Sequence, residues 1–94
     1  MVASSVQREL KELVDQVLKN LEMKSLRFTR VSVRDSKQGL EVSIKIYLEH
    51  PMRFTSIDKL MKALVNKYGI AVDDIMIYAP HSRAIRLLFT IKRR

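Results

Sequence analysis

The chain has no cysteine and no tryptophan, and its 94 residues include only two glycines and two prolines. The absence of cysteine excludes disulfides, thiolate metal ligands and thiol nucleophiles. Because small secreted domains are often crosslinked by disulfides, the lack of cysteine also favours a reducing, cytoplasmic location. With so few glycines and prolines, few positions force an interruption of regular helices or strands.

Long hydrophobic runs are also missing. None reaches the ~20 residues of a membrane-spanning helix, and charged residues follow Met1 closely, with no apolar signal segment between. Apolar residues nevertheless make up 47% of the chain, which is typical of a folded protein. The length predicts a single domain over residues 1–94, with a basic tail at 92–94.

Acidic residues are scarce in the second half, and none follows Asp74. The whole chain has 18 Lys and Arg against 10 Asp and Glu, which gives a net charge of +8. Such a charge makes a polyanionic partner plausible. The alternative is a Lys- and Arg-rich surface that serves solubility, or stability in a thermophile.

An amphipathic helix is predicted from Ser4 or Ser5, either of which can act as its N-cap, to Leu21. Its apolar residues recur at intervals of three and four and lie on one stripe. They are Val6, Leu10, Leu13, Val14, Val17, Leu18 and Leu21.

A β-hairpin is predicted over residues 26–48, with its turn at 35–39. The second strand is the clearer, because residues 40–48 alternate strictly between apolar and polar side chains. In the first strand Leu26 and Phe28 are out of phase with Val31 and Val33. A bulge near Thr29–Arg30 would reconcile them, as would burial on both faces.

After His50-Pro51 a second helix is predicted, with Thr55 or Ser56 as cap, Phe54 as an apolar staple and Gly69 at its C-terminal end. Its apolar stripe contains Ile57, Leu60, Met61, Leu64, Val65 and Tyr68. A third strand over 72–78 and a fourth over 83–92 follow, joined by a turn at 79–82.

The element order αββαββ predicts an α+β, two-layer sandwich with both helices on one face of a mostly antiparallel, four-stranded sheet. If strand four inserts between strands two and three, the sheet order is 3-4-2-1, which resembles a permuted ferredoxin-like arrangement. The other possibility is the order 1-2-3-4. We favour the first, because it places the two clearest strands at the centre. The other sheet face is then uncovered, with Leu88, Thr90, Met76 and several cations and tyrosines pointing outward.

Candidates for catalysis are weak, so we expect no enzyme, no cofactor, no metal site and no small-molecule substrate. His50 and His81 lie in predicted turns with no carboxylate at metal-ligand spacing. Asp73 and Asp74 are adjacent on a predicted strand and so point to opposite faces. No glycine-rich phosphate loop and no nucleophile elbow is present.

Basic residues beside tyrosines on an open sheet are typical of single-stranded nucleic-acid binding, in which cations contact phosphates and aromatic rings stack on bases. We therefore predict a largely sequence-independent DNA- or RNA-binding protein. The candidate contacts are Arg27, Arg30, Arg34, Lys37, Lys45, Tyr47, Tyr78, Arg83, Arg86, Lys92, Arg93 and Arg94. The alternative is a protein-interaction module, such as a homodimer formed through the sheet face or an edge strand. A small-ligand regulatory domain is a third possibility, which rests on fold analogy alone.

Overall fold

A computed structural model describes residues 3–92, which form two long helices, one short helical turn and four strands. In chain order these are α1 (Ala3–Leu21), β1 (Leu26–Ser36), β2 (Gly39–Leu48), α2 (Phe54–Tyr68), η1 (Val72–Asp74), β3 (Met76–His81) and β4 (Ala84–Lys92). The predicted order αββαββ is therefore confirmed. The short 3₁₀ turn η1 is an addition to it.

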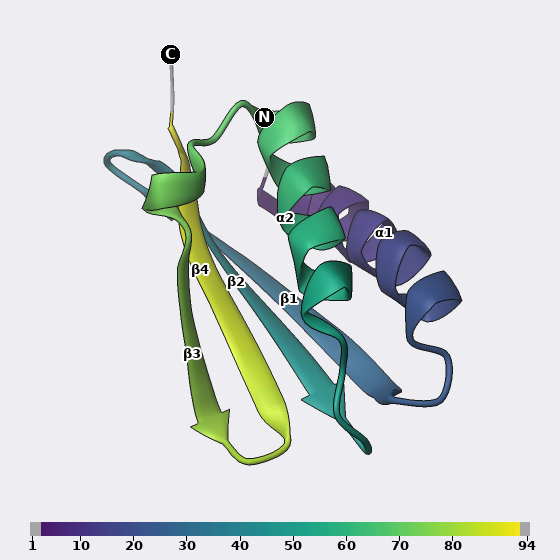
Figure 1. Cartoon of the computed structure of the whole chain (residues 1–94). Coiled ribbons are helices and arrows are strands. Elements are labelled where there is room, and N and C mark those ends of the chain that lie inside the picture. Colours follow the sequence, from purple (N-terminus) through teal and green to yellow (C-terminus); the bar gives the residue numbers. More distant parts are fainter. Residues whose placement is uncertain (1–2, 93–94) are drawn as a thin grey trace.

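The four strands form one sheet in the order β1-β2-β4-β3, and every neighbouring pair is antiparallel (Figure 1). This is the predicted order 3-4-2-1 read from the other edge, so the alternative order 1-2-3-4 is wrong. Strands β2 and β3 run in the same direction and are joined through α2, with β4 between them. The two edges of the sheet are therefore β1 and β3.

Both long helices lie on the same side of the sheet (Figure 1), and the core lies between the two layers. The apolar stripe of α1 contributes Val6, Leu10, Val14 and Leu18, and that of α2 contributes Ile57, Leu60 and Leu64. They pack against alternate residues of β2 and β4. The helices contact each other at their polar edges too, where the Tyr68 hydroxyl donates a hydrogen bond of 2.8 Å to Glu9. No described helix is long and apolar enough to span a membrane.

The predicted helix caps are wrong. Ser4 and Ser5 lie inside α1, which includes Ala3. Arg53 is the N-cap of α2, and its side chain makes no capping hydrogen bond. Phe54 is 77% exposed and therefore does not staple the helix. The C-terminal prediction is confirmed, because Gly69 has a φ of 66° and its N–H binds the carbonyl of Val65.

The bulge in β1 lies at Arg27, between Leu26 and Phe28, and not near Thr29–Arg30. Leu26 therefore faces the helices, while Phe28 points to the other side. In β1 the change of phase occurs before Thr29, which is buried together with Val31.

The third strand begins later than predicted. Val72, Asp73 and Asp74 form η1, so the two aspartates do not lie on a strand, and β3 extends through the predicted turn to His81. The turn itself is only two residues long, Ser82 and Arg83. Pairing with β4 is irregular between Tyr78 and His81, which is where Pro80 interrupts the backbone donors.

Candidate functional site

The candidate site is the sheet face that carries no helix, which we call the open face. Cross-strand register arranges its side chains in rows that run across all four strands. One row contains Phe28, Tyr47, Ala84 and His81, the next contains Arg30, Lys45, Arg86 and Tyr78, and a third contains Ser32, Ser43, Leu88 and Met76. Sequence neighbours on each strand thus contribute to different rows, and residues far apart in the chain meet within one.

Arg30, Lys45 and Arg86 form what we call the basic row. They occupy directly paired positions on three adjacent strands, β1, β2 and β4. Side chains at such positions have Cβ atoms ~5 Å apart, and like charges there destabilise a sheet. Within residues 3–92, no salt bridge joins any of the three to a carboxylate. In the part of the chain that the structure describes, these three aligned positive charges therefore have no compensating carboxylate.

Arg86 is held in place by neutral partners. Its Nε donates to the Ser43 hydroxyl at 2.8 Å, and its Nη1 donates to the Tyr78 hydroxyl at 2.7 Å. Its guanidinium also lies 5.7 Å from the centre of the Tyr78 ring. Because these partners carry no negative charge, they fix the guanidinium while its full positive charge remains available to an anion.

Phe28 and Tyr47 form a stacked pair beside the basic row, with ring centroids 4.3 Å apart and planes inclined by 20°. The His81 ring lies 6.2 Å from Tyr47 in a tilted orientation. Cations flank both rings, because Lys45 Nζ is 5.9 Å from the centre of Tyr47 and the Arg27 guanidinium is 6.0 Å from that of Phe28. Phe28 is 42% exposed, so this aromatic row (Phe28, Tyr47) presents ring surface to solvent.

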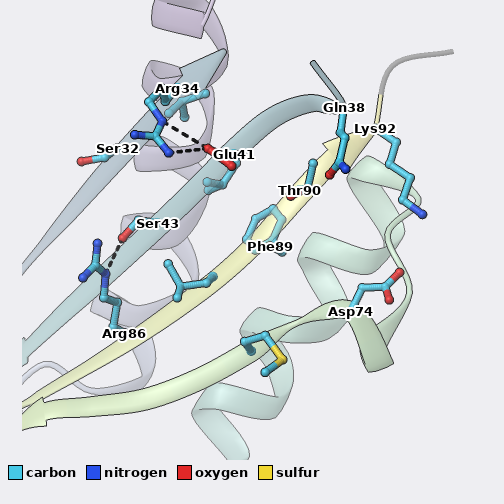
Figure 2. A pocket seen from close by; sticks show the side chains of 14 residues that line it. Ser32, Arg34, Gln38, Glu41, Ser43, Asp74, Arg86, Phe89, Thr90 and Lys92 are labelled. Atoms are coloured by element: carbon cyan, nitrogen blue, oxygen red, sulfur yellow. Dashed lines mark hydrogen bonds and ion pairs between the residues drawn. The ribbon is translucent and has the colours of Figure 1, made fainter. Parts of the chain in front are cut away.

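On the other side of the basic row the open face is hollowed, with a volume of about 660 Å³. Figure 2 shows Arg86 with Ser43 at one end of the hollow, and Gln38, Thr90 and Lys92 at the other. Leu88 and Met76 supply apolar surface. The hollow thus has a cation at each end, with the Ser43 hydroxyl beside Arg86 and hydroxyl and amide groups toward Lys92.

Two carboxylates line this hollow, and within residues 3–92 only one of them forms a salt bridge to a cation. Glu41 accepts two hydrogen bonds from Arg34, at 2.6 and 3.1 Å, and this contact raises the pKa of the Arg34 guanidinium. Asp74 reaches the rim from η1 (Figure 2). Arg34 is therefore the predicted contact whose charge is already partly compensated within the fold.

The other predicted contacts lie around the edges of the open face. Arg27 and Arg83 are near its aromatic end, in the β1 bulge and in the β3–β4 turn respectively. Lys37 lies in the β1–β2 turn and Lys92 at the end of β4, both toward the hollow. Arg93 and Arg94 fall outside the described residues. Of the predicted basic tail at 92–94, the described residues include Lys92, which is the last residue of β4.

Sequence reasoning missed Phe28 and Ser43 as members of this surface. The sequence prediction assigns Phe28 to the same face as Leu26. The alternation of Phe28 with Thr29, Val31 and Val33, which face the helices, is the signal that places it on the open face. The role of Ser43 depends on a cross-strand contact with Arg86, 43 residues away, which no local pattern reveals.

Residues 3–92 contain no group of three or more His, Asp or Glu side chains placed to hold a metal ion. His81 instead uses its Nδ1 to accept a hydrogen bond from the Arg83 backbone N–H. No protein-family model matches the chain, and searches of curated proteins and of solved structures give no significant match.

Proposed function

We propose that the protein binds single-stranded nucleic acid across its open face, with cations on the phosphates and aromatic rings on the bases. The observation that supports this most directly is the basic row, in which Arg30, Lys45 and Arg86 are aligned on neighbouring strands with no carboxylate partner among residues 3–92. A polyanion whose charges repeat along a line relieves the repulsion among all three cations at once.

The proposed path of the nucleic acid crosses the strands along the basic row. Neighbouring strands are ~4.8 Å apart. The Arg and Lys side chains are long and flexible, so their charged ends can spread beyond this spacing and reach successive phosphates of the nucleic acid. Bases on one side of the backbone then stack on the aromatic row. Bases on the other side enter the hollow, where Ser32, Ser43 and Thr90 provide hydroxyl groups without a fixed donor pattern.

Binding of this kind is largely independent of sequence, since phosphates are alike and every base has a stacking face. We further propose that the architecture is a permuted ferredoxin-like fold used as a binding module without catalytic activity. What supports this is the pairing of β2 and β3 with β4 between them, together with an open face rich in cations and aromatics.

The test is a titration of labelled single-stranded oligonucleotides at several salt concentrations. We expect saturable binding. The logarithm of the association constant should fall linearly with the logarithm of the salt concentration, with a slope of roughly −0.7 per phosphate contacted. Arg30→Gln, Lys45→Gln and Arg86→Gln should each weaken binding and reduce that slope. Lys59→Gln is the matched control, because Lys59 is an exposed cation on α2, on the far side of the sheet.

A second arm of the experiment separates stacking from charge. Phe28→Leu should weaken binding by ~1–3 kcal/mol per stacked base while leaving the salt slope unchanged. Phe54→Leu, on the 77% exposed ring of α2, is its control. Because the chain lacks tryptophan, its intrinsic fluorescence comes from Tyr47 and Tyr78 on the open face and from Tyr68 on α2, so Tyr68→Phe isolates the signal of the open face. No saturable binding at low salt, or equal losses in the control variants, would overturn the proposal.

A further inference from the structure

Strand β3 is an unprotected edge of the sheet. All six of its residues are exposed, although it is paired with β4 along one side. Met76, Ile77 and Tyr78 are 64%, 55% and 44% exposed, so large apolar side chains meet solvent on both faces of the strand. The helices leave this edge open, because α1 and α2 lie toward the β1 and β2 side (Figure 1). An apolar edge of this kind is a template for another strand.

Charge distinguishes this edge from the opposite one. From Met76 to Pro80, β3 carries no charged side chain. The outer strand at the other edge, β1, carries Arg27, Arg30 and Arg34. Two copies of a chain with net charge +8 repel each other, and the repulsion is smallest where they approach through uncharged surface. The β3 edge is suited to contact with a second copy, whereas the β1 edge is not.

We propose that two copies pair antiparallel through β3 about a two-fold axis and form one continuous eight-stranded sheet. Each copy supplies the same uncharged strand, so one surface is complementary to itself, as a two-fold interface requires. Pairing centred on Ile77 places the two Ile77 side chains side by side on the helix-bearing side. On the open face it places Met76 of one copy opposite Tyr78 of the other.

Pro80 limits this pairing and does not prevent it. Proline lacks the backbone N–H, and the β3–β4 ladder is irregular between Tyr78 and His81. The pairing therefore covers the segment before Pro80, where Met76, Ile77 and Tyr78 lie. Each copy uses its β3 edge once in this two-fold contact, which leaves no β3 edge free for a further copy and favours a closed pair over an open fibre.

Dimerisation would also join the two open faces. Tyr78 ends the row that contains Arg30, Lys45 and Arg86, and it lies on the edge strand itself. In the dimer the basic row of each copy therefore continues, beyond Tyr78, into the row of the other copy that begins with Met76, and both rows lie on one surface. The dimer itself depends only on the β3 edge, so it stands or falls independently of nucleic-acid binding.

The first test is sedimentation equilibrium of the nucleic-acid-free protein over a wide concentration range. We expect a monomer–dimer equilibrium in which Ile77→Lys raises the dissociation constant at least tenfold, because it places two ammonium groups together at the axis. Phe54→Lys is the control, since it adds the same charge at a more exposed apolar position on α2. A monomer at all concentrations overturns the proposal. So does a dimer that Phe54→Lys disrupts and Ile77→Lys does not.

The second test uses the absence of cysteine in the chain. Met76→Cys, Ile77→Cys and Tyr78→Cys are made singly and oxidised under mild conditions. Only the residue that faces its own copy across the axis comes close enough for a disulfide, and we expect this to be position 77. Phe54→Cys is the control for random collision. Equal crosslinking at position 54 and at all three β3 positions would contradict the two-fold pairing.

Discussion

Glu22 is a buried carboxylate with no cationic partner among residues 3–92. It is 6% exposed, and its Oε1 accepts hydrogen bonds from the Arg53 backbone N–H at 2.9 Å and from the Ser56 hydroxyl at 3.0 Å. Both donors belong to the N-terminus of α2, where unpaired backbone N–H groups favour a negative charge. The residue after α1 thus caps α2 and fixes the two helices together at one end.

Replacing Glu22 separates its charge from its hydrogen bonds. We expect Glu22→Ala to lower the free energy of unfolding by ~1–3 kcal/mol, because the buried Ser56 hydroxyl and the Arg53 N–H lose their acceptor. Glu22→Gln keeps an acceptor oxygen and should cost ~0.5–1 kcal/mol through loss of the charge–dipole interaction. Urea unfolding measures both, with the exposed Glu12→Gln on α1 as control. If Glu22→Ala leaves the free energy of unfolding unchanged, α2 does not need the cap that Glu22 provides.

At the scale of elements, α1 is attached to β1 by a polar contact beside the core. The Thr29 hydroxyl donates to Asp15 at 2.6 Å, and Lys11 donates to the same carboxylate and to Thr29. Burial of Asp15 opposes its ionisation, but the hydrogen bonds from Lys11 and Thr29 outweigh it, so the pKa of Asp15 lies below its ordinary value. The ionised form therefore holds the helix to the edge strand.

The lowered pKa of Asp15 makes this attachment sensitive to acid. Its stabilisation is fully present above the unfolded pKa of ~4 and is lost as pH falls through the lower folded value. We expect Asp15→Asn to cost ~1 kcal/mol at pH 7 and little in strong acid. Urea unfolding at several pH values measures the difference. Asp58→Asn is the control, because Asp58 has a similar lysine partner at 2.9 Å but a more exposed carboxylate. Equal pH profiles for both variants would contradict this role.

Periodicity predicted the elements that depend on local pattern and missed the features that depend on distant residues. The strict alternation of residues 40–48 defined both faces of β2, and the spacing of α2 identified its buried stripe. The bulge at Arg27 was misplaced because two phases of β1 fit the same residues equally well. The cap on α2 was missed because its acceptor lies 31 residues from Arg53 in the sequence. For the same reason the sequence identified individual tyrosines and cations but not their arrangement in rows. The rows follow from the pairing register of the four strands.

At the scale of the whole molecule, the aligned cations imply a conflict between stability and binding. Net charge of +8 disfavours the compact state, and the basic row concentrates part of that repulsion on the open face. We expect Arg30→Gln to raise the free energy of unfolding by ~0.2–1 kcal/mol, because it removes a like-charge pair with Lys45. The same variant should bind single-stranded nucleic acid more weakly.

Lys59→Gln changes the net charge equally and controls for the global effect. Since salt screens such repulsion, the gain from Arg30→Gln should shrink as ionic strength rises. If Arg30→Gln destabilises the protein, or stabilises it no more than Lys59→Gln does, the basic row carries no repulsion for a polyanion to relieve.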